Sequence, residues 1–526
     1  MSPYFENKLW DTSGKSTFQF FKPPESINQS LRDLKTKPAS HWEKKGERMA
    51  MRLFKFVSAS VPAYQYLLKK RRIRASSIKA ISDFRKLPII DKDYYLRRAK
   101  TANLFPNRDV SRVTTFSATS GSTGEPFYFP RGREQDAQYE YIAELFLKNQ
   151  WEIDKHKTLG VIGFGLGIWI GGIFTYKNFN RIAEKGYQLS LVPAGANVDT
   201  FLRPIAKFGH LFDQIILMGY PPFIKDAIDE AKDYKIDWKK YRLRIMTAAE
   251  GYSEKFRNYI SQKAQLKNPL IDTLNIYGTV ELGTMAHETP LTNLIRRIAV
   301  ENQKVFKEIF PQANRLPTLA QYHPQIVYFE EVQGEVIASG YGSAFPLLRY
   351  RFPDMGGVIK FDEMIKKLKA AGIDILGEAE KAKISHTIMR LPFVYVYDRS
   401  DHAVSLVGII LYPEYLRDIF HEEPFSNHLT GKFTMVIKYD VKQNQSLEVN
   451  LELKKRAKKH LNNKNLIKFI QEEIVKTLIE KSTEYNHLYG LGSEKYRKSL
   501  TPKIILWPYQ HPKFFKPGGK QRWVKK

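Results

Sequence analysis

The sequence between residues 114 and 395 alternates short apolar runs with helical patterns, and this alternation constrains the fold more strongly than any other feature. Residues 214–218 and 334–338 are typical apolar runs, whereas residues 223–234 have the spacing of an amphipathic helix. A chain in which strands alternate with helices forms a sheet with helices packed on its faces. The sequence therefore predicts an α/β fold with several layers for this region.

The last quarter of the chain follows a different pattern. Along residues 447–453 apolar side chains alternate with polar ones, Asn450 and Glu452 among them, which predicts a half-buried strand. We expect this strand to pair with residues 433–439 in a hairpin, and residues 466–478 to form a helix. We therefore expect three parts: a helical N-terminal portion of the large domain in residues 1–110, an α/β core in residues 111–397, and a small α+β domain in residues 398–526.

The composition excludes several classes of protein. The 526 residues contain 84 Lys and Arg against 55 Asp and Glu, and the resulting net charge of +29 favours anionic partners. The absence of cysteine excludes disulfides, thiol nucleophiles and thiolate zinc sites, and makes the cytoplasm the expected compartment. Charged residues near the start argue against a secretory signal. Residues 158–176 are uncharged, but their six glycines favour a strand that runs into a loop over a transmembrane span.

Two runs of basic residues, 69–74 and 454–459, have the charge to bind an anionic partner. Runs of this kind are in most cases solvated faces. Their other uses are contact with an anionic membrane surface, nucleic acid, or the phosphates of coenzyme A. We expect solvated faces, keep peripheral contact with an anionic membrane as an alternative, and do not expect nucleic acid as the partner.

A run of hydroxyl residues and glycines follows an apolar stretch at residues 113–116. Glycines let backbone N–H groups converge on phosphate oxygens, and hydroxyls add uncharged donors. The run is not a Walker A loop, because no lysine follows its second glycine, and a solvated linker is the alternative. The sequence therefore predicts a phosphate-binding loop, which comprises Thr119, Ser120, Gly121, Ser122, Thr123 and Gly124.

This loop resembles the phosphate-binding motif of the adenylate-forming superfamily, which includes acyl-CoA synthetases, luciferases and peptide-synthetase adenylation domains. Further motifs follow in the order of that family. Residues 247–252 resemble the segment that lines the adenine, and residues 277–281 resemble the motif whose tyrosine packs on adenine and whose glutamate holds magnesium. The resemblance implies nucleotide-binding roles for Ala249, Glu250, Tyr277, Gly278 and Thr279, and a catalytic, magnesium-holding role for Glu281.

Three more motifs lie toward the C-terminus. Residues 349–355 resemble the motif whose aspartate, here Asp354, binds the ribose hydroxyls. Residues 398–402 resemble the hinge between the two domains, with Arg399 near the nucleotide and Asp401 as the hinge residue. Residues 518–522 resemble the C-terminal loop that carries the catalytic lysine, here Lys520. The resemblance thus implies a large domain of several layers and a small, mobile C-terminal lid.

Within the superfamily, residues 84–92, 191–195 and 218–222 resemble the branch of phenylacetate-CoA ligases and capsule-synthesis proteins. Departures from the family pattern include Glu125 in place of a lysine and Val280 in place of a hydroxyl residue. Pro353 and Asp398 also replace glycines. The departures keep open a degenerate nucleotide-binding relative with a nucleic-acid or membrane-surface role.

The resemblance implies ATP-dependent activation of an aryl or acyl carboxylic acid to an acyl-adenylate, and transfer of the acyl group to a thiol. The implied cofactors are ATP, Mg²⁺ and coenzyme A, and no zinc is expected. A protein or amine is the alternative acceptor. We place the acyl pocket near Phe164, Tyr220 and Ala248, and the oligomeric state stays open, with a homodimer as one option.

Overall fold

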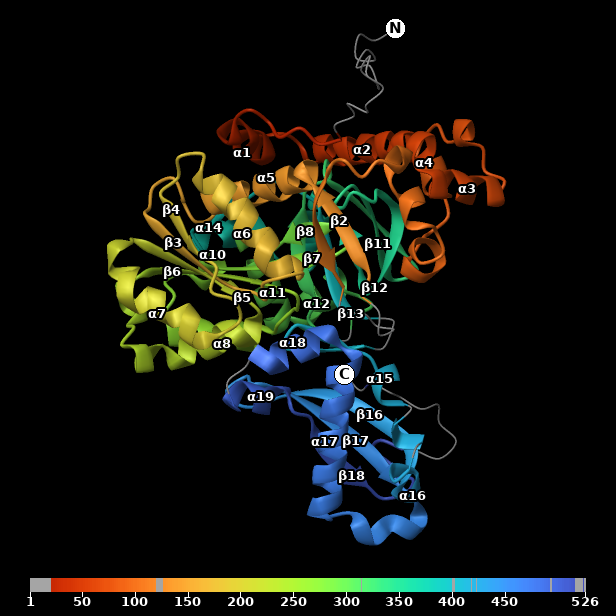
Figure 1. The fold of residues 1–526 in the computed structure, drawn as a ribbon. Coiled ribbons are helices and arrows are strands. Elements are labelled where there is room, and N and C mark those ends of the chain that lie inside the picture. Colours follow the sequence, from red (N-terminus) through yellow and green to blue (C-terminus); the bar gives the residue numbers. More distant parts are fainter. Residues whose placement is uncertain are drawn as a thin grey trace.

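The protein is described by a computed structural model that covers residues 20–119, 126–313, 315–399, 403–417, 419–421, 423–491, 494–515 and 524. Figure 1 shows two parts: a large part formed by residues 20–399 and a small part formed by residues 403–524. This is the α/β architecture with a small C-terminal unit that the sequence predicts.

A large mixed sheet forms the centre of the large part, with strand order β10-β11-β12-β13-β9-β8-β7-β6-β5-β3-β4. Neighbouring strands from β4 to β7 run parallel, and those from β7 to β10 run antiparallel. Its strands are β3 Thr158–Gly163, β4 Leu189–Val192, β5 Gln214–Gly219, β6 Arg242–Ala248, β7 Thr273–Thr279, β8 Gly283–His287, β9 Thr318–Tyr322, β10 Val327–Val332, β11 Glu335–Gly340, β12 Leu347–Ile359 and β13 Phe393–Arg399.

A separate hairpin of the large part, β1 Val113–Ala118 with β2 Tyr128–Gly132, pairs antiparallel. The helices cover the faces of the sheet, and α1 to α3 cross the top of the large part in Figure 1. The helices of the large part are α1 Ile27–Thr36, α2 Ala39–Ser60, α3 Pro62–Lys70, α4 Ile81–Phe84, α5 Arg133–Asn149, α6 Ile170–Ala183, α7 Val198–Phe208, α8 Pro221–Glu230, α9 Glu254–Ala264, α10 Pro269–Asp272, α11 Pro290–Glu301, α12 Gln303–Ile309, α13 Phe361–Ala370 and α14 Ile375–Lys381.

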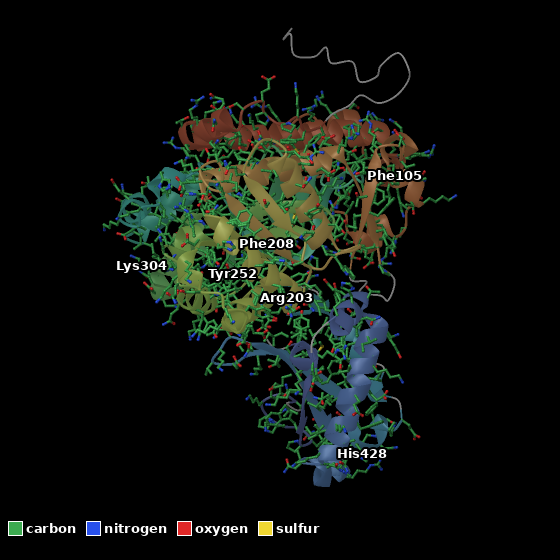
Figure 2. All side chains as sticks on the ribbon, turned by 60° about the vertical axis from the view of Figure 1, so that its left-hand side comes forward. Phe105, Arg203, Phe208, Tyr252, Lys304 and His428 are labelled. Carbon is green, nitrogen blue, oxygen red and sulfur yellow. The ribbon has the colours of Figure 1, made fainter. Side chains whose placement is uncertain are left out.

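The apolar runs of the sequence become the central parallel strands. Every residue of β3 and β5 is buried, because helices cover both faces of a parallel sheet. The uncharged segment 158–176 forms β3, a loop and the start of α6, as its glycines indicate. Across the described residues, no helix combines the length and the apolar character that crossing a bilayer requires. In Figure 2 the side chains fill the interiors of both parts.

The small part contains a sheet of order β16-β17-β18 and a short hairpin, β14-β15, that precedes it. The predicted pairing of residues 433–439 with residues 447–453 is confirmed by the register of β16 and β17. The elements of the small part are β14 Val404–Leu406, β15 Ile409–Leu411, α15 Glu414–Arg417, α16 Phe425–His428, β16 Leu429–Tyr439, β17 Gln445–Leu453, α17 Lys464–Lys481, α18 Thr483–Leu491, α19 Glu494–Leu500 and β18 Lys503–Trp507.

The expectation of a half-buried β17 is wrong, because the polar side chains Asn450 and Glu452 are fully buried. Strand β17 lies between β16 and β18, and the segment after β18 folds back over the polar face. The Trp507 Nε1–H donates to Asn450 Oδ1 at 2.6 Å, and the Gln510 N–H donates to Glu452 Oε1 at 2.7 Å. The buried polar groups are therefore satisfied by residues distant in sequence.

Two buried histidines lie side by side in the core, and the ring centroids of His287 and His323 are 6.1 Å apart. Burial lowers the pKa of His287 to about 4. Burial, with a smaller contribution from His287, lowers the pKa of His323 to about 3. Both rings are therefore neutral in the folded protein at neutral pH.

The unfolded chain takes up protons on these histidines below a pH of about 6.5, whereas the folded protein does so only below about 4. We expect each histidine to lower the free energy of unfolding by up to about 1.4 kcal/mol per pH unit as the pH falls through this window. Denaturant unfolding between pH 7 and 4.5 measures this slope. His323→Phe should make it shallower, whereas the same change at the exposed His210 should not; equal slopes in both variants would contradict the assignment.

Candidate active site

The candidate site lies where the parallel strands end. Strands β3, β5 and β6 are in register at Gly163, Gly219 and Thr247, so their carboxyl ends meet at the same edge of the sheet. In α/β sheets of this kind, ligands bind in the crevice outside these ends. Phe164 and Tyr220 follow β3 and β5 directly, whereas Ala248 is the last residue of β6.

Two residues predicted for the acyl pocket lie in contact at this edge. The rings of Phe164 and Tyr220 pack edge to face with centroids 5.4 Å apart, and both are buried. Ala248 pairs with Ile276 of β7 in the neighbouring strand and is half-buried. The structure thus brings the predicted acyl-pocket residues to one edge of the sheet, and their role in binding an acid stays a prediction.

Residues of three separate motifs meet beside them. The Tyr277 hydroxyl donates a hydrogen bond of 2.7 Å to Asp354 Oδ2, and an Arg399 guanidinium nitrogen lies 3.6 Å from Asp354 Oδ1. Asp354 and Arg399 face each other because β12 and β13 pair antiparallel at this position. Burial and the charge of Asp354 raise the pKa of Tyr277 well above its ordinary value, so the hydroxyl stays protonated.

Glu281 lies in the turn between β7 and β8, directly after the strand that bears Tyr277. Its Oε1 lies 3.4 Å from the Tyr350 hydroxyl and 3.6 Å from Lys92 Nζ. Lys92 lies in the branch-specific segment 84–92, whose sequence gives no sign of a role for this lysine in the site. Only the tertiary structure brings it to Glu281, because the two residues are remote in sequence.

A buried arginine supports this turn. Arg131 of β2 is fully buried and donates to the carbonyl oxygens of Val280 and Gly342, the second at 2.5 Å. Burial lowers the pKa of Arg131 to about 10, while the charges of Glu281 and Asp136 oppose that shift. Arg131 therefore fixes the main chain next to Glu281, a role that its local sequence does not indicate.

The donor set can hold Mg²⁺ together with a nucleotide. Mg²⁺ binds oxygen ligands and in nucleotide sites takes one or two carboxylates, with phosphate oxygens and water completing its shell. Glu281 provides one carboxylate beside Lys92 and Tyr350. In the described ranges no three His, Cys, Asp or Glu side chains are grouped as a protein-only metal site. A single carboxylate beside Lys92 and Tyr350 matches the kind of site in which phosphate oxygens and water complete the shell of Mg²⁺.

The carboxylate of Glu250 faces the small part, and its predicted contact with the nucleotide stays a prediction. Its Oε2 accepts hydrogen bonds of 3.1 Å from Ser405 Oγ and from Gln445 Nε2, both in the small part. Burial raises the pKa of Glu250 to about 7, against the hydrogen bonds from Gln445 and Ser405. Its main-chain oxygen accepts from Asn275 Nδ2 at 3.1 Å. In this arrangement the carboxylate of Glu250 joins the two parts.

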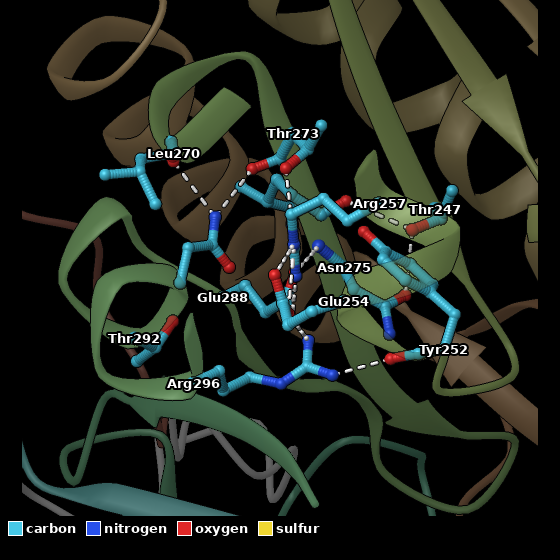
Figure 3. A network of polar contacts seen from close by, with 12 residues as sticks. Thr247, Tyr252, Glu254, Arg257, Leu270, Thr273, Asn275, Glu288, Thr292 and Arg296 are labelled. Carbon is cyan, nitrogen blue, oxygen red and sulfur yellow. Dashed lines mark hydrogen bonds and ion pairs between the residues drawn. The ribbon is translucent and has the colours of Figure 1, made fainter. Parts of the chain in front are cut away.

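A network of buried charges supports the segment that contains Glu250. Figure 3 shows Glu254 and Glu288 between the guanidinium groups of Arg257 and Arg296. Arg257 lies 2.8 Å and Arg296 2.5 Å from Glu288 Oε1, and Arg296 also donates to the Tyr252 carbonyl oxygen at 2.5 Å. Each buried charge thus has an opposite charge beside it. The network ties α9 and α11 to the chain directly after β6.

Arg296→Met should destabilise the folded protein by about 3–5 kcal/mol, because it leaves the buried carboxylates of Glu254 and Glu288 to share Arg257. Arg297→Met is the matched control, since Arg297 is the next residue of α11 and is only half-buried. The control should cost under about 1 kcal/mol. Denaturant unfolding of the two variants measures the difference, and similar losses would show that the network is not what stabilises this region.

Several predicted site residues lie outside the described residues. They are Ser120, Gly121, Ser122, Thr123, Gly124, Asp401 and Lys520. Thr119 is described, and it closes the base of the predicted phosphate loop: its Oγ1 accepts from the Phe127 N–H at 3.1 Å.

Gly278 lies in close contact with the β8 backbone, since a Cβ there would lie 2.6 Å from the Gly283 carbonyl oxygen. Ala249 has a left-handed backbone with φ of 77°.

Neither the protein-family models nor the curated proteins contain a match to this sequence. Solved structures do match, and they define the fold as that of CoA ligases. A structure of 2-hydroxyisobutyryl-CoA ligase with 2-HIB-AMP and CoA in the thioesterification state has a TM-score of 0.62 at 14% identity, with 98% of this chain and 96% of that chain covered. An open conformation of the same ligase has a TM-score of 0.51 at 12% identity, with 99% and 98% covered.

Proposed function

We propose that this protein uses ATP to activate a carboxylic acid as an acyl-adenylate and then transfers the acyl group to the thiol of coenzyme A. The observation that carries the proposal is the meeting of Tyr277, Asp354 and Arg399 beside the Glu281 turn, at the carboxyl edge of the parallel strands. These residues come from three motifs of the adenylate-forming family, and they share one site in a fold like that of a CoA ligase.

The residue types suit this chemistry. A carboxylate is a poor acyl donor and must first be activated. In the first step a carboxylate oxygen attacks the α-phosphorus of ATP, and pyrophosphate leaves with the bonding electrons. The thiolate of coenzyme A then attacks the acyl carbonyl, and AMP leaves. In this proposal Asp354 accepts hydrogen bonds from the ribose hydroxyls, and Tyr277 packs on the adenine. Arg399 places a positive charge beside the Asp354 carboxylate.

Negative charge on the phosphates is the main electrostatic demand of the first step. Glu281 is the residue that would hold Mg²⁺, which when bound neutralises phosphate charge. Lys92, 3.6 Å from Glu281, adds a cation at the same place. Arg131 keeps the turn that bears Glu281 in position through its bonds to Val280 and Gly342.

The arrangement of the two parts supports the second step. The TM-score is higher against the thioesterification state of the ligase than against its open conformation, 0.62 against 0.51. We infer that the small part, as the lid of residues 398–526, stands here in the orientation for thioester formation. Asp401 is the proposed hinge, and rotation about it would present another face of the lid for adenylation.

The finer assignments are part of the same proposal. We place the protein in the branch of phenylacetate-CoA ligases and capsule-synthesis proteins, in the cytoplasm. The acid contacts Phe164, Tyr220 and Ala248, and the phosphates contact Thr119 and the loop that follows it. Coenzyme A is the proposed acceptor, and a protein or an amine is the alternative. The dependence of product formation on the acceptor supplied distinguishes them.

An exchange assay tests the proposal. Incubation with ATP, Mg²⁺, labelled pyrophosphate and a panel of aryl, fatty and amino acids should give label in ATP with at least one acid. Asp354→Ala should reduce that exchange at least tenfold, because ATP loses charge-assisted hydrogen bonds to its ribose. No exchange with any acid would exclude the ligase and favour the degenerate nucleotide-binding relative.

Lys520→Ala should separate the two half-reactions. The proposed role of the lysine ammonium is to stabilise charge that builds on the α-phosphate, a contact whose loss costs about 3 kcal/mol, or about a hundredfold in rate. Exchange should fall by that factor, whereas thioester formation from supplied acyl-adenylate should stay within threefold. Lys526→Ala is the control in the same C-terminal sequence. Equal losses in both half-reactions would contradict the role.

A further inference from the structure

Two adjacent residues at the start of β17 join the small part to the large part. Asn444 Oδ1 accepts a hydrogen bond of 2.6 Å from Lys225 Nζ, and Gln445 Nε2 donates one of 3.1 Å to Glu250 Oε2. Lys225 belongs to α8 and Glu250 to the segment after β6. The turn between β16 and β17 therefore contacts two separate segments of the large part.

Lys225 is unusual because its side chain is almost completely buried, with 2% of the residue exposed. A buried ammonium needs polar or charged partners around it. Asp229 Oδ2 lies 2.8 Å away, Asp226 lies 3.6 Å away, and the Tyr259 ring centroid lies 5.5 Å away. Asn444 provides a further partner from the small part, so this contact helps to compensate for the burial of Lys225.

The side chain of Asn444 is held in the orientation that this contact requires. Its Nδ2 donates to Asp440 Oδ2 at 2.6 Å, and its main-chain N–H donates to Asp440 Oδ1 at 2.8 Å. With the amide nitrogen bound to Asp440, the amide oxygen is directed to Lys225. The contact is therefore preorganised within the turn of the small part.

The second contact is also part of a larger arrangement. Gln445 Oε1 accepts from the Val407 N–H at 2.7 Å, which ties the turn to the β14-β15 hairpin. Ser405 of the same hairpin donates to Glu250. Gly408, with φ of +83°, packs so closely on Tyr220 that a Cβ there would lie 2.8 Å from the ring. The hairpin and the turn thus contact the large part together, next to a predicted acyl-pocket residue.

We propose that Asn444 and Gln445 are positioning residues that form a clasp on Lys225 and Glu250 and hold the lid in the orientation for thioester formation. This inference rests on the proposed function. Lys225 and Glu250 are part of the large part in every orientation of the lid, whereas the clasp forms in one orientation only. Interactions made in one of two states shift the population toward that state. The clasp therefore favours the second half-reaction without contacting the reacting atoms.

The orientation of the lid can be measured without any substrate. The chain has no cysteine, so cysteines introduced at the exposed Lys240 and Lys464 accept spin labels at those positions alone. Distances between the labels, measured by pulsed electron paramagnetic resonance on the full-length protein, report the orientation. The parent should show one main distance. Asn444→Leu should add a second population of at least 30%, and Asn462→Leu, the same change at an exposed lid residue, should add none.

A distance distribution that is unchanged by Asn444→Leu and by Gln445→Leu would overturn the clasp. Circular dichroism and the denaturation midpoint show whether each variant is folded. A double variant, Lys225→Met with Asn444→Leu, should shift the population no further than Asn444→Leu does, because the two residues act through one contact. Additive shifts would show that they act separately and would also overturn the proposal.

The half-reactions give the second test. Asn444→Leu should slow acyl-CoA formation from supplied acyl-adenylate at least fivefold. The rate of ATP–pyrophosphate exchange should rise, or fall by no more than twofold. Equal effects on both steps would overturn the clasp. Absence of exchange in the unaltered protein would instead reject the proposed function, and the spin-label distances would still decide whether Asn444 and Gln445 set the orientation.

Discussion

The parallel register of β3, β5, β6 and β7 is the constraint on which the site depends. Hydrogen bonding between these strands brings their carboxyl ends to one edge, and the chain leaves each strand there in a loop. Residues that are far apart in sequence, such as Phe164 and Tyr220, meet for this reason alone. The antiparallel strands β12 and β13 extend the same sheet and add Asp354 and Arg399 to that edge.

Buried charge stabilises the loops at this edge. Arg131 holds the turn that bears Glu281, and the network around Arg257 and Arg296 supports the segment after β6. Buried ion pairs add little net stability compared with apolar packing, but they are specific, because each charge accepts few arrangements of its partners. In this protein the buried arginines bind the turn next to Glu281 and the segment after β6, and both belong to the candidate site.

The contact between the two parts links this support to the proposed motion of the lid. Glu250 is attached on one side to Asn275 of β7 through its main chain, and on the other to Ser405 and Gln445 through its carboxylate. The proposed rotation of the lid would break these hydrogen bonds, which bind the segment that resembles the adenine-lining motif. The proposed function thus links nucleotide binding and lid orientation through one short stretch of chain.

The sequence by itself determined the fold class and indicated the candidate site residues. Alternating apolar runs predict the parallel strands, since a fully buried strand must be apolar throughout, and Tyr277 and Asp354 lie in short motifs that are recognisable locally. The tertiary structure alone decided the places of Lys92 and Arg131, whose partners are remote in the chain. It also decided the burial of Glu452, which its strand pattern predicted to be solvated. The physical reason is that periodicity reports which side of one element is apolar, whereas the pairing of a polar group depends on which other elements pack against it.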